Sequence, residues 1–167
     1  MQIEAEQALE LLARGLASVL QAQAVAAPRL VGIQTGGVWV AERLHAALGI
    51  AAPLGTLDIS FHRDDYGEVG LNPVVRPSRL PWDVNGADLV LVDDVLFTGR
   101  TVRAAINELF DWGRPRSVLL AVLVARDGRE LPIAADVAGA AIDLGPGRQI
   151  KLRGPAPLRF ELVDEPR

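Results

Sequence analysis

"LVLVDDVLFTGRT", residues 89–101, joins four apolar residues to two aspartates and then to a loop that contains two threonines and a glycine. The apolar run is typical of a buried strand, and residues 101–112 have the apolar spacing of a helix. A buried strand that leads directly into a helix is the unit from which parallel α/β sheets are built. This stretch therefore predicts one strand and one helix of a parallel α/β sheet.

The two halves of this stretch have the chemistry to hold a sugar phosphate. Ionised Asp93 and Asp94 only accept hydrogen bonds, and the vicinal hydroxyls of a ribose are donors that match them. The backbone N–H groups of residues 96–101, the hydroxyls of Thr98 and Thr101 and the positive end of the following helix converge on one anion site. The glycine between the threonines permits a close approach of the backbone to a phosphate.

The same residues have a second interpretation. Aspartate and threonine also favour helix-capping turns, so an acidic pair before a helix is by itself consistent with a cap. The residue types alone leave both interpretations open.

The rest of the chain predicts an α/β fold with a doubly wound parallel sheet, because strands alternate with helices. Residues 62–85 carry charges, prolines and little periodicity, which predicts a long mobile loop. Ligands bind beyond the carboxyl ends of parallel strands, so the loops at 34–37, 93–100 and 125–130 are candidates for the site. Helices are expected at 3–22, 38–49 and 101–112, and strands at 29–33, 54–61, 88–92 and 117–124, with smaller strands after Leu131.

Length and composition restrict the function. The 167 residues fit one domain, 1–167, with room for a substantial core. No cysteine and only two histidines are present, which excludes thiolate chemistry and a histidine-rich metal site. The apolar runs are shorter than the roughly 20 residues of a membrane span. The acidic start "MQIEAEQALE" lacks the basic region of a secretory signal, so a cytoplasmic protein is expected.

The stretch at 89–101 resembles the phosphoribosyl pyrophosphate (PRPP) motif of type I phosphoribosyltransferases, which has four apolar residues, two acids and a threonine/glycine loop in this order. From about Leu30 to Ile133 the chain resembles the PyrR family, whose members are pyrimidine-operon attenuators and also uracil phosphoribosyltransferases. The segments that carry this resemblance are "VGIQTGGVWVAERL", "LDISFHRDDYGEVG", "VDDVLFTGRTVRAA", "GRPRSVLLAVLVAR" and "RELPI".

The resemblance implies a type I phosphoribosyltransferase fold with a core at about 28–125, a mobile loop at about 62–85 and a small C-terminal hood at about 125–167. It implies that uracil and PRPP are converted to uridine monophosphate (UMP) and pyrophosphate, with Mg²⁺ held mainly through PRPP. It also implies a homodimer or a higher homo-oligomer.

Roles for individual residues follow from the resemblance. Asp93 and Asp94 would hold the ribose hydroxyls, and Asp94 and Arg63 would be the catalytic residues. The 5′-phosphate loop would comprise Val95, Leu96, Phe97, Thr98, Gly99, Arg100 and Thr101. The pyrophosphate loop would comprise Thr35, Gly36 and Gly37, and the mobile catalytic loop would comprise Arg63, Asp64 and Asp65. The base site would comprise Arg126 and the hood residue Ile150.

Two of these assignments also have plainer interpretations. The glycine pair is consistent with an ordinary tight turn between a strand and a helix, and the Arg63–Asp65 segment is consistent with a solvated charged turn. We nevertheless expect Arg63 to move onto the departing pyrophosphate, because charge builds up there while C1 of the ribose becomes cation-like.

The chain departs from the family pattern at three positions. Gly36 stands where members usually have an arginine, Ala125 where they commonly have an acid, and Gly128 where they have a histidine. These departures leave the ribose and phosphate residues unchanged. They bear instead on pyrophosphate binding and on the base side of the site.

Two further functions remain open from the sequence. An RNA-binding regulator that recognises its own mRNA leader would need a basic face, and the only acid-free basic stretch comprises Arg148, Lys151, Arg153 and Arg159. A purine phosphoribosyltransferase would use the same sugar-phosphate residues with a different base. The net charge of −4 argues against a domain-wide nucleic-acid surface.

Overall fold

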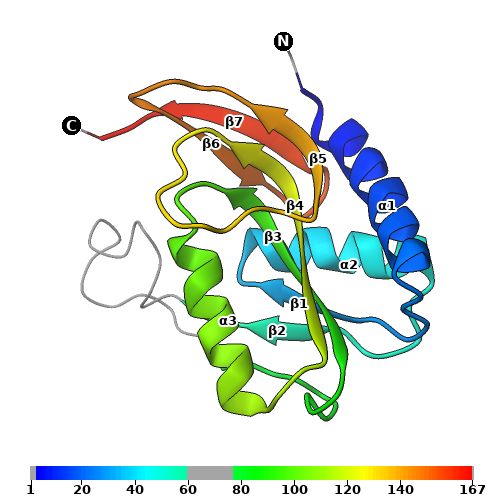
Figure 1. Ribbon diagram of the computed structural model, residues 1–167. Helices are drawn as coiled ribbons and strands as arrows, with labels where there is room; N and C mark the ends of the chain where they lie inside the picture. The colour runs from blue at the N-terminus through cyan, green and yellow to red at the C-terminus, as the bar shows by residue number, and fades with distance from the viewer. Residues whose placement is uncertain (1–2, 60–76, 167) are drawn as a thin grey trace.

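The computed structural model describes residues 3–59 and 77–166, which form a five-stranded sheet with helices on both faces and a separate two-stranded sheet (Figure 1). No helix within these two ranges is both long and apolar enough to cross a membrane. The elements in chain order are α1 (Ala5–Ala22), β1 (Arg29–Ile33), α2 (Gly36–Leu48), β2 (Gly55–Leu57), β3 (Asp88–Leu96), α3 (Arg100–Trp112), β4 (Ser117–Arg126), β5 (Val137–Ile142), β6 (Arg148–Arg153) and β7 (Arg159–Asp164).

The large sheet has the strand order β2-β1-β3-β4-β5, and all four neighbouring pairs are parallel. From β1 the chain adds β2 on one side and the later strands on the other. The direction of winding therefore reverses between β1 and β3. In open α/β sheets a crevice forms at this switch point, outside the carboxyl ends of the strands.

Alternating residues of β3 pack against opposite helical layers. Val90 and Val92 belong to a buried cluster with α1 and α2, whereas Leu89 and Leu91 belong to a second cluster with α3. A strand that is buried on both faces needs the continuous apolar run seen in this sequence. The predicted doubly wound α/β fold is confirmed.

The small sheet consists of β6 and β7, which pair antiparallel above the carboxyl ends of β3 and β4 (Figure 1). The structure corrects the predicted hood at 125–167, because β5 pairs in parallel with β4 and completes the large sheet. The sequence signal for β5 is weak, since "VAGAAI" lacks the large apolar side chains of a central strand. As an edge strand, β5 is paired on one side only.

Three other boundaries differ from the prediction. The strand expected at 54–61 is only Gly55–Leu57, and the strand expected to end at residue 92 continues to Leu96. Of the predicted mobile loop at 62–85, residues 62–76 lie outside the described ranges. Leu80 and Val84 at its end are buried in the α3-side core, so this part is packed instead of mobile.

Candidate active site

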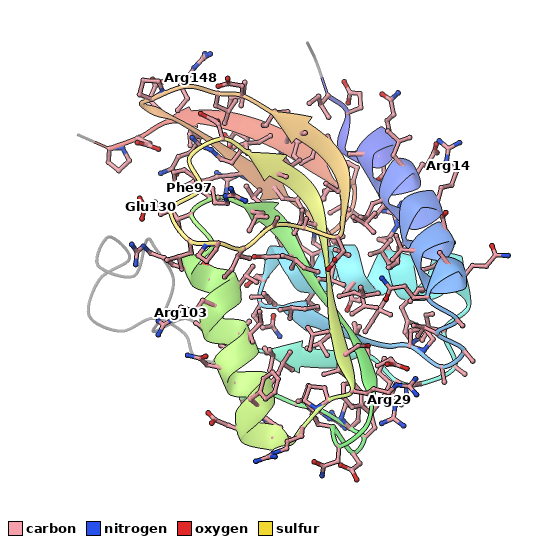
Figure 2. All side chains as sticks on the ribbon, in the orientation of Figure 1. Arg14, Arg29, Phe97, Arg103, Glu130 and Arg148 are labelled. Carbon is pink, nitrogen blue, oxygen red and sulfur yellow. The ribbon has the colours of Figure 1, made fainter. Side chains whose placement is uncertain are left out.

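A cavity of about 480 Å³ lies at the carboxyl ends of β1, β3 and β4, beneath β6. Figure 2 shows Phe97 and Glu130 at this end of the sheet, with Arg29 at the opposite end. All three loops predicted from the topology contribute to its wall. The lining residues are Thr35, Gly36, Trp39, Asp93, Asp94, Val95, Phe97, Thr98, Thr101, Arg126, Glu130, Gln149, Ile150, Lys151, Leu152, Arg153 and Glu165.

The two aspartates belong to β3 and do not form a helix-capping turn. Asp93 is buried and accepts a hydrogen bond on Oδ1 from the Asp94 backbone N–H at 2.9 Å. Asp94 is partly exposed and accepts one on Oδ1 from the Val95 backbone N–H at 2.9 Å. Each carboxylate is thus oriented by the next backbone N–H, and both line the cavity.

The predicted phosphate loop, residues 95–101, joins β3 to α3. Gly99 precedes the first residue of α3 with φ +96°, a conformation that residues with a side chain rarely adopt. No side chain caps this end of α3, and the Oγ1 of the buried Thr98 accepts a hydrogen bond from the Arg100 N–H at 3.2 Å. An uncapped N-terminus of a 13-residue helix is suited to an anion.

The predicted pyrophosphate loop joins β1 to α2, and its Gln34–Thr35 peptide bond is cis. Its glycines lie against β3. A Cβ on Gly37 would come within 2.6 Å of the Val92 carbonyl, and one on Gly36 within 2.7 Å of Asp94 Cγ. At Gly37 the contact is with backbone atoms, so glycine is required there for close packing of the α2 N-terminus against β3, whereas a Cβ at Gly36 would meet only the side chain of Asp94.

The predicted base-site residue Arg126 is the last residue of β4. Its guanidinium lies 3.9 Å from the Phe97 ring centroid, and the side chain is only 4% exposed. It donates to the Asp127 carbonyl at 3.1 Å and to the Arg148 carbonyl at 2.8 Å. Arg126 therefore ties the start of β6 to β4 as well as lining the cavity.

The loop after Arg126 is fixed by Asp127. The Leu144 backbone N–H donates to Asp127 Oδ1 at 2.9 Å, and this bond is the main reason that the pKa of the Asp127 carboxyl lies below its usual range. An ionised carboxylate held in this way ties the loop after β4 to the segment that follows β5.

Some predicted site residues do not line the cavity. The side chain of Leu96 packs in the core, and Gly37, Gly99 and Arg100 are also absent from the cavity wall. Ile150 is buried in β6 and does line it. Arg63, Asp64 and Asp65 lie outside the described residues.

Several lining residues were not predicted. Trp39 follows Gly36 by three residues in α2, so helical periodicity alone places it on the same face. A Cβ on Gly154 would lie 2.8 Å from Trp39 Cε3, which shows that Trp39 packs against the segment after β6. Lys151, Arg153 and Glu165 come from the C-terminal hairpin, whose position over the cavity has no local signal in the sequence.

Comparisons with known proteins agree with this geometry. The family model "Phosphoribosyl transferase domain" matches residues 1–144. The bifunctional protein PyrR of Pseudomonas savastanoi pv. phaseolicola is 56% identical over 153 residues, which cover 92% of this chain and 90% of that protein. The bifunctional protein PyrR of Pseudomonas fluorescens is 54% identical over 153 residues, with 92% and 91% covered.

Among solved structures, a hypoxanthine-guanine phosphoribosyltransferase from Bacillus anthracis superposes with a TM-score of 0.66 at 14% identity and covers 86% of this chain and 82% of its own. That similarity concerns the fold alone. Together with the matches in sequence, it shows that the chain belongs to the phosphoribosyltransferase family and, within that family, to the PyrR proteins.

Proposed function

We propose that the protein is a cytoplasmic uracil phosphoribosyltransferase that forms UMP and pyrophosphate from uracil and PRPP. The observation that carries this proposal is the cavity, because the Asp93–Asp94 pair, the phosphate loop and the two-glycine loop surround one volume of about 480 Å³. A volume of this size suits a small-molecule substrate.

In the proposed reaction, a ring nitrogen of uracil forms a bond to C1 of the ribose, the bond from C1 to pyrophosphate breaks, and the nitrogen loses its proton. The carboxylates of Asp93 and Asp94 would accept hydrogen bonds from the ribose hydroxyls. They would thereby hold C1 between the attacking uracil nitrogen and the departing pyrophosphate. Asp94 faces the cavity, so its negative charge would also stabilise the cation-like ribose.

Mg²⁺ would accompany PRPP and neutralise charge on the departing pyrophosphate. Among residues 3–59 and 77–166, no three or more His, Cys, Asp and Glu side chains are grouped as a metal site. The oxygen atoms of Asp93 and Asp94 suit a hard cation, but two carboxylates supply fewer than its six ligands. PRPP and water would therefore provide most of the coordination.

Arg63 would neutralise part of the charge on the departing pyrophosphate. This role rests on the sequence alone. An Arg63→Ala variant is expected to lose most of its kcat with a smaller change in the dissociation constant of UMP, which carries no pyrophosphate. Unchanged UMP synthesis by this variant would refute the role.

The assignment of uracil, and not a purine, rests on the relatives. The PyrR proteins are 54–56% identical to this chain, whereas the hypoxanthine-guanine enzymes share only the fold at 14–22% identity. The test is to incubate the protein with PRPP and Mg²⁺, to supply uracil, hypoxanthine or guanine in turn, and to identify the nucleotide. Formation of only a purine nucleotide would refute the assignment.

A second function, regulation through pyrimidine leader RNA, is supported by the word "bifunctional" in the names of these relatives. The basic residues near the C-terminus are interleaved with acids in the β6–β7 hairpin, where Lys151 is opposite Glu161 and Arg153 is bonded to Glu161. Because these acids neutralise nearby basic residues, we expect the β6–β7 hairpin to contribute less to an RNA-binding surface than its basic residues alone would indicate. Binding to the leader RNA that requires a uridine nucleotide and weakens with salt supports this function, and no binding at low salt refutes it.

We also propose that the protein forms homodimers or higher homo-oligomers. Phe110 and Trp112 at the end of α3 are 54% and 45% exposed, and exposed aromatic side chains are enriched in protein interfaces. Sedimentation of the protein across a hundredfold range of concentration tests this, and a monomer throughout would refute it.

A further inference from the structure

The predicted phosphate loop is contacted by the last residue of β4 and the segment that follows it. Each of the four consecutive residues 97–100 has a partner in residues 126–133, which we call the loop clamp. Figure 2 shows Phe97 and Glu130, one from each segment, at the same end of the molecule. The motif "RELPI", residues 129–133, has no role in the proposed reaction and falls within the loop clamp.

Phe97 is contacted on two sides. The Arg126 guanidinium lies 3.9 Å from its ring centroid. A Cβ on Gly128 would lie 2.5 Å from Phe97 Cε2, and Gly128 has φ +101°. Only glycine meets both conditions without moving the ring.

Thr98 is held through its backbone. Its carbonyl accepts hydrogen bonds from the Glu130 N–H at 3.0 Å and from the Leu131 N–H at 3.1 Å. Thr98 is also buried, and a buried carbonyl with two donors has little freedom to rotate. The orientation of the Thr98–Gly99 peptide, whose N–H belongs to the predicted phosphate site, is thereby fixed.

Gly99 is covered by apolar side chains. A Cβ on Gly99 would lie 3.3 Å from Leu131 Cβ and 3.4 Å from Ile133 Cβ. Arg100 is bonded to the Glu130 carboxylate, with Nε at 3.0 Å, but the two side chains are 55% and 52% exposed. Exposed ion pairs contribute little, so the backbone bonds and the apolar cover hold the loop.

We propose that the loop clamp fixes the phosphate loop in its anion-binding shape and that Gly128 and Ile133 are positioning residues for the 5′-phosphate. This inference rests on the proposed function, because it assigns the 5′-phosphate of UMP and PRPP to residues 95–101. The loop clamp would also connect the base site with the 5′-phosphate site, because Arg126 lines the cavity and its guanidinium also stacks on Phe97.

Ile133→Ala tests the loop clamp without a change of charge, and Ile106→Ala is the matched control. Both isoleucines are partly buried and pack against the same core cluster, but Ile106 lies in the middle of α3. The readout is the ratio of dissociation constants for uridine and UMP, which isolates the contribution of the phosphate. A loop that must be ordered on binding loses about five- to thirtyfold in affinity for each residue that becomes mobile.

Ile133→Ala is therefore expected to reduce the preference for UMP over uridine by about five- to thirtyfold, whereas Ile106→Ala leaves it unchanged at a similar loss of melting temperature. An unchanged preference in Ile133→Ala, or an equal loss in both variants, would overturn the loop clamp. A second variant, Gly128→Ala, is expected to reduce the same preference through Phe97. If the wild-type protein binds UMP no better than uridine, the proposed function fails and the loop clamp with it.

Discussion

A methyl group at position 36 would meet the carboxyl group of Asp94. The Cβ of Gly36→Ala would lie 2.7 Å from Asp94 Cγ and 3.1 Å from Asp94 Cβ. Ordinary contact begins near 3.4 Å, so the carboxyl carbon must move by at least about 0.7 Å. Asp94 is partly exposed and lines the cavity, and the methyl group meets only atoms of its side chain, so the strain is expected to be relieved by displacement of its carboxylate.

The displacement is expected to lower activity without lowering stability. A hydrogen bond from a ribose hydroxyl to a carboxylate contributes roughly 1.5–3 kcal/mol, so losing one reduces kcat/KM for PRPP about tenfold to a hundredfold. Gly36 is the first residue of α2, where alanine favours the helix by up to about 1 kcal/mol. The assay compares kcat/KM for PRPP with the free energy of unfolding in urea.

A double-mutant cycle shows whether Gly36→Ala acts through Asp94. If it does, the Gly36→Ala/Asp94→Ala protein is no less active than Asp94→Ala alone. Gly15→Ala is the matched control, because it also adds a methyl group to a helix and meets a side chain, Val137 Cγ1 at 2.7 Å, on α1 and away from the cavity. Full activity of Gly36→Ala, or additive losses in the cycle, would refute the reasoning.

Three further predictions concern the base side, the opposite end of the sheet and the core. Arg126→Ala is expected to raise KM for uracil at least tenfold, because it removes the hydrogen bond to the Arg148 carbonyl at the start of β6. Steady-state kinetics measure this KM, and an unchanged value contradicts the prediction. The hydrogen bond from Arg116, reinforced by Ser117, lowers the pKa of Asp88, so Asp88→Asn should cost about 1 kcal/mol of stability near pH 7 with activity intact. A lowered carboxyl pKa contributes stability that is fully present above the unfolded-state pKa of about 3.9 and is lost as the pH falls through the lower folded-state pKa. This difference should therefore start to shrink below about pH 4 in urea titrations, and a constant difference contradicts it. Leu16→Ala, at a fully buried position of α1, should cost about 2–5 kcal/mol by the same titrations while kcat at low temperature is retained.

The fold was predictable where strands and helices carry strong local patterns. The run "LVLV" must be buried on both faces, and α3 has apolar residues at helical spacing, so a parallel sheet with helices follows. The edge strand β5 was predicted only as one of the smaller strands after Leu131, and its place in the large sheet was missed. Its small residues and glycine carry a weak strand signal, and its position depends on pairing with β4. The boundary of β3 was missed because carboxylates are rare in strands, although each one here is satisfied by the next backbone N–H.

The loops of the candidate site were predictable, whereas of the residues that cover it from the β6–β7 hairpin only Ile150 was predicted. Residues 35–37 and 93–101 follow strands of the sheet, and topology alone brings the carboxyl ends of β1 and β3 together. Gln149, Lys151 and Glu165 reach the cavity only because the β6–β7 hairpin folds over it, and that depends on long-range contacts such as Arg126 to the Arg148 carbonyl. No short sequence window contains such a contact.

At two of the positions that depart from the family pattern, Gly36 and Gly128, the neighbouring side chains explain why glycine is present. Gly36 lies against the Asp94 carboxyl group, and Gly128 lies against the Phe97 ring with φ +101°, so a side chain at either position would displace its neighbour. Each glycine contacts a residue of the 89–101 stretch. The missing arginine and histidine are therefore replaced by closer packing on that stretch. It follows that restoring either side chain alone, as in Gly36→Arg, should reduce PRPP binding by displacing its neighbour, whereas a lost cationic contact would predict tighter binding.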